Sequence, residues 1–124
     1  MDYVATEKAP RAIGPYSQAV RAGDVLYASG QIPLDPATGE LVVGDFAAQA
    51  RRVFANLAAV LEAAGTDFQH VVKATVYLTN LSDFQTLNGI YAERFGDHKP
   101  ARSTVGVAQL PKGATVEIDV VAVL

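Results

Sequence analysis

The clearest periodic pattern of apolar residues lies between residues 46 and 64. Its apolar positions recur every three or four residues and so share one face of a helix: Phe46, Ala50, Val53, Leu57, Val60, Leu61 and Ala64. Asp45 is a suitable N-cap and Gly65 a suitable residue just past the end, because a short acceptor side chain and a glycine are favoured at those positions. The pattern predicts a helix over 46–64.

A second helix is predicted after Ser82, ending near Phe95 and before Gly96. Ser82 and Gln85 have the spacing of a capping box, with the serine as N-cap and the glutamine at the third helical position. The apolar stripe of this helix consists of Phe84, Leu87, Tyr91 and Phe95.

Between these helices, residues 71–79 alternate between two kinds of side chain, which is typical of a strand with two different faces. One face would carry Val72, Ala74, Val76 and Leu78, and the other Lys73, Thr75, Tyr77 and Thr79. Further strands are predicted at 2–6, 17–21, 25–29, 101–107 and 114–123. Gly23 lies in the turn between the second and third of these, where a tight hairpin needs a positive φ.

This order of elements predicts an α+β fold with one mixed six-stranded sheet and two helices on one face. The length of 124 residues fits a single domain over 1–124. Two helices cover one face of such a sheet, and the other face keeps enough apolar residues to need cover. We therefore expect the chain to associate with copies of itself.

Composition narrows the classes of function. Charged residues make up 19% of the chain, below the usual ~25%, which leaves apolar surface for a partner. The net charge of -3 makes nucleic acid an unfavourable ligand, because such binding depends on neutralising phosphates. With no cysteine, disulfides, thiolate metal sites and cysteine nucleophiles are excluded. The N-terminus does not resemble a signal peptide and no apolar run approaches ~20 residues, so we expect a cytoplasmic protein without membrane association.

Candidate chemistry begins with polar residues in apolar surroundings. Arg102 lies early in a predicted strand, Glu117 lies in the middle of another, and Asn88 lies on the second helix. One interpretation is an Arg102–Glu117 ion pair or solvated edge positions, since a buried unpaired charge is costly. The other is a binding site, with a guanidinium fork for a small carboxylate and a carboxylate to handle water. The spacing alone favours the first interpretation without excluding the second. His70 and His98 have no metal-ligand spacing.

Four segments, taken in order, resemble the Rid/YjgF family of reactive-intermediate (enamine/imine) deaminases. They are Ile13-Gly14-Pro15-Tyr16-Ser17-Gln18-Ala19, Ala28-Ser29-Gly30-Gln31-Ile32-Pro33-Leu34-Asp35, Pro100-Ala101-Arg102-Ser103-Thr104-Val105 and Val116-Glu117-Ile118-Asp119. The resemblance extends over essentially the whole chain. It implies a chorismate-mutase-like α+β fold and a homotrimer with three sites in clefts between subunits.

The resemblance also implies an activity: hydrolysis of 2-imino acids, such as 2-iminopropanoate and 2-iminobutanoate, to 2-oxo acids and ammonia. These imines form from the enamines released by PLP-dependent dehydratases. Arg102 would hold the substrate carboxylate and Glu117 would position or activate the attacking water. The pocket would be lined by Tyr16, Ser29, Gly30, Gln31, Phe84, Asn88 and Thr104. An imine carbon is already electrophilic, so positioning suffices and we expect no metal or cofactor.

One position departs from the family pattern. Many bacterial members carry cysteine where this chain has Thr104, so thiol chemistry is excluded here. Arg102 favours the deaminating branch, because subfamilies without this arginine are generally not imine deaminases. Two alternatives are a carboxylate-binding or regulatory trimer without turnover, and the ribonuclease or translation-inhibitor activity attributed to some relatives. The net charge of -3 argues against the second.

Overall fold

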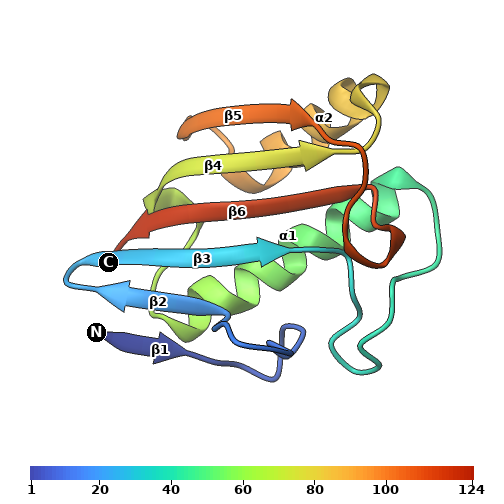
Figure 1. The fold of residues 1–124 in the computed structure, drawn as a ribbon. Helices are drawn as coiled ribbons and strands as arrows, with labels where there is room; N and C mark the ends of the chain where they lie inside the picture. Colours follow the sequence, from blue (N-terminus) through green and yellow to red (C-terminus); the bar gives the residue numbers. More distant parts are fainter.

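A computed structural model describes all 124 residues, which form one six-stranded mixed sheet with two helices (Figure 1). The strands lie in the order β1 (Asp2–Val4), β2 (Ala19–Ala22), β3 (Val25–Gln31), β6 (Val116–Val123), β4 (Val71–Leu78) and β5 (Ala101–Gly106). Only β4 and β5 are parallel, and helix α2 (Phe84–Phe95) connects them. Helix α1 (Phe46–Ala63) connects β3 to β4, and both helices lie on the same face of the sheet. The predicted fold class is confirmed.

Helix α1 supplies much of the core between helices and sheet. Asp45 caps it as predicted, accepting a hydrogen bond from the Ala48 backbone N–H at 2.9 Å, and Gly65 follows its end with a φ of +83°. Phe54, which the predicted stripe did not include, is fully buried and packs edge-on against Phe68, Tyr91 and Phe95. Aromatic packing therefore joins α1 to α2.

The predicted capping box at Ser82 is wrong. Residues Leu81–Asp83 form a short 3-10 turn that leads directly into α2, and no side chain caps that helix. The Ser82 hydroxyl instead donates to the Asn80 side-chain oxygen at 2.8 Å, and that oxygen also accepts from the Ser82 backbone N–H. Asn80 thus takes the capping role one turn earlier.

The prediction that Val72 lies on the same face of β4 as Ala74 is also wrong. A register shift in the β4–β6 pairing falls between Val71 and Lys73, so Val72 is an extra residue in a β-bulge. Val71 is fully buried in its place, while Val72 is 45% exposed. From Ala74 onward the predicted alternation holds, with Ala74, Val76 and Leu78 buried.

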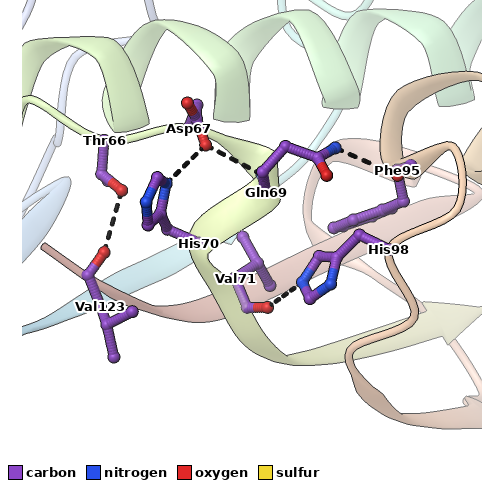
Figure 2. Close-up of polar contacts among 8 residues, drawn as sticks. All are labelled: Thr66, Asp67, Gln69, His70, Val71, Phe95, His98 and Val123. Atoms are coloured by element: carbon purple, nitrogen blue, oxygen red, sulfur yellow. Dashed lines mark hydrogen bonds and ion pairs between the residues drawn. The ribbon is translucent and has the colours of Figure 1, made fainter.

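The junction between the helices and the start of β4 is held by polar contacts that include both histidines (Figure 2). Asp67 accepts from the Gln69 backbone N–H at 2.9 Å and lies 2.8 Å from His70 Nδ1. His98 Nε2 donates to the Val71 carbonyl at 2.6 Å. The histidines therefore have structural contacts here, and the chain contains no cluster of His, Asp or Glu side chains suited to a metal ion.

The face of the sheet opposite the helices is left uncovered by any element (Figure 1). This open face carries Thr75 and Tyr77 of β4 and Glu117 and Asp119 of β6, all partly exposed. Neither helix combines the length and apolar character needed to cross a bilayer.

Candidate active site

The predicted site residues fall into two clusters. Five of them, Tyr16, Ser29, Gly30, Gln31 and Glu117, line one cavity of about 690 Å³. The remainder of the wall consists of Pro10, Arg11, Ile13, Gln18, Ile32, Leu34, Pro111 and Lys112. We call this group the Glu117 cavity. The other four predicted residues, Phe84, Asn88, Arg102 and Thr104, lie on α2 and β5, and we call them the Arg102 cluster.

A β-bulge in β3 shapes the Glu117 cavity. Ala28 pairs with Val120 and Gln31 pairs with Ile118, so Ser29 and Gly30 together lie opposite a single residue of β6. The Ser29 backbone N–H donates to the Gln18 carbonyl at 2.9 Å. This bulge brings the backbone of Gly30 against the side chain of Glu117.

The carboxylate of Glu117 lies close against the backbone of Gly30. A methyl group built on Gly30 would overlap the carboxylate of Glu117, so only glycine leaves room for it in this position. Burial, together with the nearby negative charge of Asp119, raises the pKa of the Glu117 carboxyl above its ordinary value. Glu117 is therefore better suited to exchange protons near neutral pH than an exposed glutamate.

Gln18 holds residues 6–10, the last of which lines the cavity. Its side chain is 3% exposed; its amide nitrogen donates to the carbonyls of Thr6 (3.0 Å), Ala9 (3.3 Å) and Pro10 (2.7 Å). Its amide oxygen accepts from the Thr6 backbone N–H at 2.6 Å. Because Pro10 is one of its partners, Gln18 fixes part of the cavity wall. In the sequence, Gln18 stands out only as part of the segment 13–19, and that segment does not indicate this role.

Arg102 is oriented by α2. Its Nη1 donates to the Asn88 side-chain oxygen at 2.8 Å, and its guanidinium carbon lies 4.8 Å from the ring centre of Tyr91 and 5.4 Å from that of Phe84. Arg102 forms no ion pair with a carboxylate. The guanidinium is thus held by an amide and two aromatic faces, with further N–H groups available for an anion.

Two buried hydroxyl groups near this cluster lack a hydrogen-bond partner, those of Tyr91 and Thr104. Burial raises the pKa of the Tyr91 hydroxyl, with the Arg102 charge acting in the opposite direction. Sequence reasoning assigned Tyr91 to the apolar stripe of α2 and so missed its contact with Arg102. Only its place one turn after Asn88 could have indicated it.

Within one chain, Arg102 and Glu117 lie on opposite faces of the sheet. Arg102 of β5 pairs with the buried Ala74 of β4, which faces the helices. Glu117 of β6 pairs with Tyr77 of β4, which lies on the open face. The Arg102–Glu117 ion pair that the spacing favoured is not formed. The expectation of a carboxylate beside the guanidinium is likewise wrong for a single chain, because Arg102 and Glu117 pair with two residues of β4 that face opposite ways.

The family model described as endoribonuclease L-PSP matches residues 6–124. The chain belongs to the Rid/YjgF family. Bovine 2-iminobutanoate/2-iminopropanoate deaminase is 50% identical over 97% of this chain and 88% of its own length. RidA from the Antarctic bacterium Psychrobacter has 47% identity and a TM-score of 0.96, with all of both chains covered. Escherichia coli TdcF, solved with bound serine, has 42% identity and a TM-score of 0.94 over 100% of this chain and 99% of its own. The two solved relatives share the fold over the full length of this chain.

Proposed function

We propose that this Rid protein hydrolyses 2-imino acids, the imines of small 2-oxo acids, to 2-oxo acids and ammonia. The observation that carries the proposal is the Arg102 guanidinium, which Asn88 and two aromatic rings orient without a carboxylate partner. A bovine relative named 2-iminobutanoate/2-iminopropanoate deaminase and a relative solved with bound serine support a small carboxylate as ligand.

Arg102 would bind the substrate carboxylate. A planar guanidinium can form two parallel hydrogen bonds to a carboxylate and so fixes its orientation as well as its position. Because Asn88 already occupies one N–H of Arg102, the fork has a defined direction before substrate arrives. Phe84 and Tyr91 limit access of water to the charge, which strengthens its attraction for an anion.

Glu117 would handle the protons of the reaction. As a water oxygen bonds to the imine carbon, Glu117 takes a proton from that water and passes it to the imine nitrogen, which gives a carbinolamine and leaves Glu117 ionised again. Glu117 then takes the proton of the carbinolamine hydroxyl as the carbonyl forms, and gives it to the departing nitrogen as the carbon–nitrogen bond breaks. The sum is one water consumed and one ammonia released. The raised pKa of Glu117 suits both directions of transfer.

A complete site would need two copies of the chain. Since Arg102 and Glu117 lie on opposite faces of one sheet, we propose that the Arg102 cluster of one copy faces the Glu117 cavity of its neighbour in a homotrimer. The uncovered sheet face supports such an assembly. We place this reaction in the cytoplasm, where the dehydratases that release enamines would act.

The decisive experiment supplies the unstable imine in situ. A PLP-dependent threonine or serine dehydratase is mixed with the protein, and the imine is trapped with semicarbazide at timed intervals. We expect the protein to lower the trapped imine and raise the rate of 2-oxo acid formation. An unchanged decay at protein concentrations well above the dehydratase would contradict the proposal.

A second candidate, carboxylate binding without turnover, also rests on Arg102. It predicts that calorimetry detects 2-oxobutanoate binding while imine decay stays unchanged. The endoribonuclease description of the family model suggests RNA cleavage, but the net charge of -3, from 13 acidic against 10 basic residues, disfavours binding to phosphates.

A further inference from the structure

A cluster of three titratable side chains lies on the open face of the sheet. Asp119 follows Glu117 by two residues in β6, so both carboxyl groups project from the same face. Tyr77 lies directly across from Glu117 on β4, and its hydroxyl donates to Asp119 Oδ2 at 3.0 Å. The tyrosine therefore contacts one carboxylate while lying beside the other. The proton transfers proposed for Glu117 involve neither Tyr77 nor Asp119.

We propose that Asp119, held in place by the Tyr77 hydroxyl, is a positioning residue that lets Glu117 both accept and return a proton. This inference rests on the proposed function for the reaction that Glu117 performs. Its structural part, the coupling between two carboxyl groups, can be tested without any substrate.

The geometry explains why Asp119 would matter. Imine hydrolysis requires one group to take a proton from water and later to protonate the departing nitrogen. A fully ionised carboxylate does the first well and the second poorly. A second negative charge held nearby favours the protonated form and so balances the two tasks. Because the Tyr77 hydroxyl is bonded to Asp119, this charge cannot rotate freely into solvent.

The other groups around Glu117 leave this coupling intact. Arg11, Lys112 and Tyr16 line the same cavity, but neither cation lies within ion-pair distance of Glu117. Lys73, further along the open face, is bonded to the Ser103 hydroxyl at 3.0 Å. Burial is the largest cause of the raised pKa of Glu117, and the Asp119 charge is the other cause. In the proposed trimer, Arg102 of a neighbouring copy adds the same charge to every variant below.

The first test measures the titration of Glu117 directly by carbon-13 NMR of its carboxyl group. Replacing Asp119 by Asn removes the charge and keeps an acceptor for Tyr77. We expect the midpoint for Glu117 to fall, because a nearby like charge is lost. Asp119→Glu, which restores the charge, should bring most of the shift back. Asp24→Asn, on the exposed turn between β2 and β3, is the matched control and should leave the midpoint unchanged.

A second comparison isolates the tyrosine. Tyr77→Phe keeps the ring beside Glu117 and removes only the hydroxyl that holds Asp119. We expect a smaller downward shift of the Glu117 midpoint than in Asp119→Asn. A variant with both Tyr77→Phe and Asp119→Asn should have the same Glu117 midpoint as Asp119→Asn alone, because Tyr77 would act through Asp119. Additive shifts, an unchanged midpoint in Asp119→Asn, or an equal shift in Asp24→Asn would each overturn the inference.

The pH profile of imine hydrolysis connects the coupling to catalysis. In Asp119→Asn, the acid limb of kcat/KM should move down in pH by the same amount as the NMR midpoint, while kcat at neutral pH falls. An NMR shift with an unmoved kinetic profile would overturn the catalytic part of the inference. If the wild-type protein hydrolyses no imine, the proposed function fails, and the NMR comparison alone still decides whether Asp119 is coupled to Glu117.

Discussion

Gly30 leaves the space that the Glu117 carboxylate occupies, and a single methyl group would remove it. The backbone of Gly30 does not have the positive φ that would itself require glycine. We therefore expect Gly30→Ala to displace Glu117 and lower kcat at least as much as the loss of its carboxylate does. The melting temperature should change little, because the cavity is open to solvent. Activity near wild type would show that Glu117 can act from another position.

Arg102→Ala tests the carboxylate clamp. Loss of one partner of a buried, hydrogen-bonded charge pair costs roughly 2–5 kcal/mol, which corresponds to a fall of about 30- to several thousand-fold in kcat/KM. Since Arg102 is bonded to the neutral Asn88, its removal strands no carboxylate and the melting temperature should stay near wild type. Arg94→Ala is the matched control, since Arg94 also lies over an aromatic ring, that of Phe68, at 5.8 Å. A variant that still binds 2-oxobutanoate would contradict this role.

Glu117→Gln separates binding from proton transfer. Glutamine nearly keeps the shape but cannot accept the proton of water, and general-base catalysis is typically worth ~10²–10⁴-fold. We expect kcat to fall within that range while 2-oxo acid binding by calorimetry is retained. Glu62→Gln, an exposed residue of α1, is the control and should have no effect. An unchanged kcat would reduce Glu117 to a structural residue.

The same variant should show a pH-dependent gain in stability. The folded-state pKa of Glu117 is raised, so the unfolded chain releases this proton at a lower pH than the folded one. The free energy of unfolding therefore falls as the pH rises through the pKa of Glu117 in the unfolded chain, and the loss is complete above its pKa in the folded chain. Glu117→Gln removes this loss. Its melting temperature should match wild type at about pH 3 and exceed it modestly at pH 7.

At the level of elements, sequence patterns predicted the order, type and approximate ends of the helices and strands, but neither bulge. Periodicity places Val72 inside, and only the pairing with β6 shows that Val71 takes that position. The bulge at Ser29 and Gly30 likewise depends on the partner strand. Bulges arise from tertiary pairing, which local patterns do not contain.

The sequence likewise predicted one part of the candidate site and not the rest. The family resemblance named nine residues, and five of them line one cavity. Strand alternation by itself could not reveal that Arg102 and Glu117 face opposite ways, because that requires the registers of β4 with both neighbours. Tyr91 and Gln18 were missed because apolar packing and backbone support leave no distinctive spacing in a sequence.

The side chain of Gln18 joins residues 6–10 to the sheet. In Gln18→Leu, three carbonyls and one N–H lose their partner, and each unsatisfied buried group costs about 1–3 kcal/mol. We expect the free energy of unfolding to fall by at least ~2 kcal/mol, seen as a lower urea midpoint at unchanged slope. Gln85→Leu, at an exposed glutamine of α2, is the control. An equal midpoint in both variants would show that solvent satisfies these groups.

The half-covered sheet and the site divided between two faces both predict a homotrimer. Three chains of 13.1 kDa would form a particle of about 39 kDa, which light scattering can measure. A stable monomer at micromolar concentration would contradict a site shared between copies. Mass alone, however, does not show which copy supplies which residue.

Complementation between two inactive variants tests the shared site directly. Arg102→Ala and Glu117→Gln are unfolded together in equal amounts and refolded as mixed trimers. If Glu117 of one copy works with Arg102 of its neighbour, every mixed trimer contains one interface where both residues are intact. Random assembly then makes about three quarters of the trimers mixed, with one site in three restored, so roughly a quarter of wild-type activity should return. If each copy used its own Arg102 and Glu117, no interface would combine the two intact residues. The mixture would then remain as inactive as its components, and the proposed assembly of the site would be wrong.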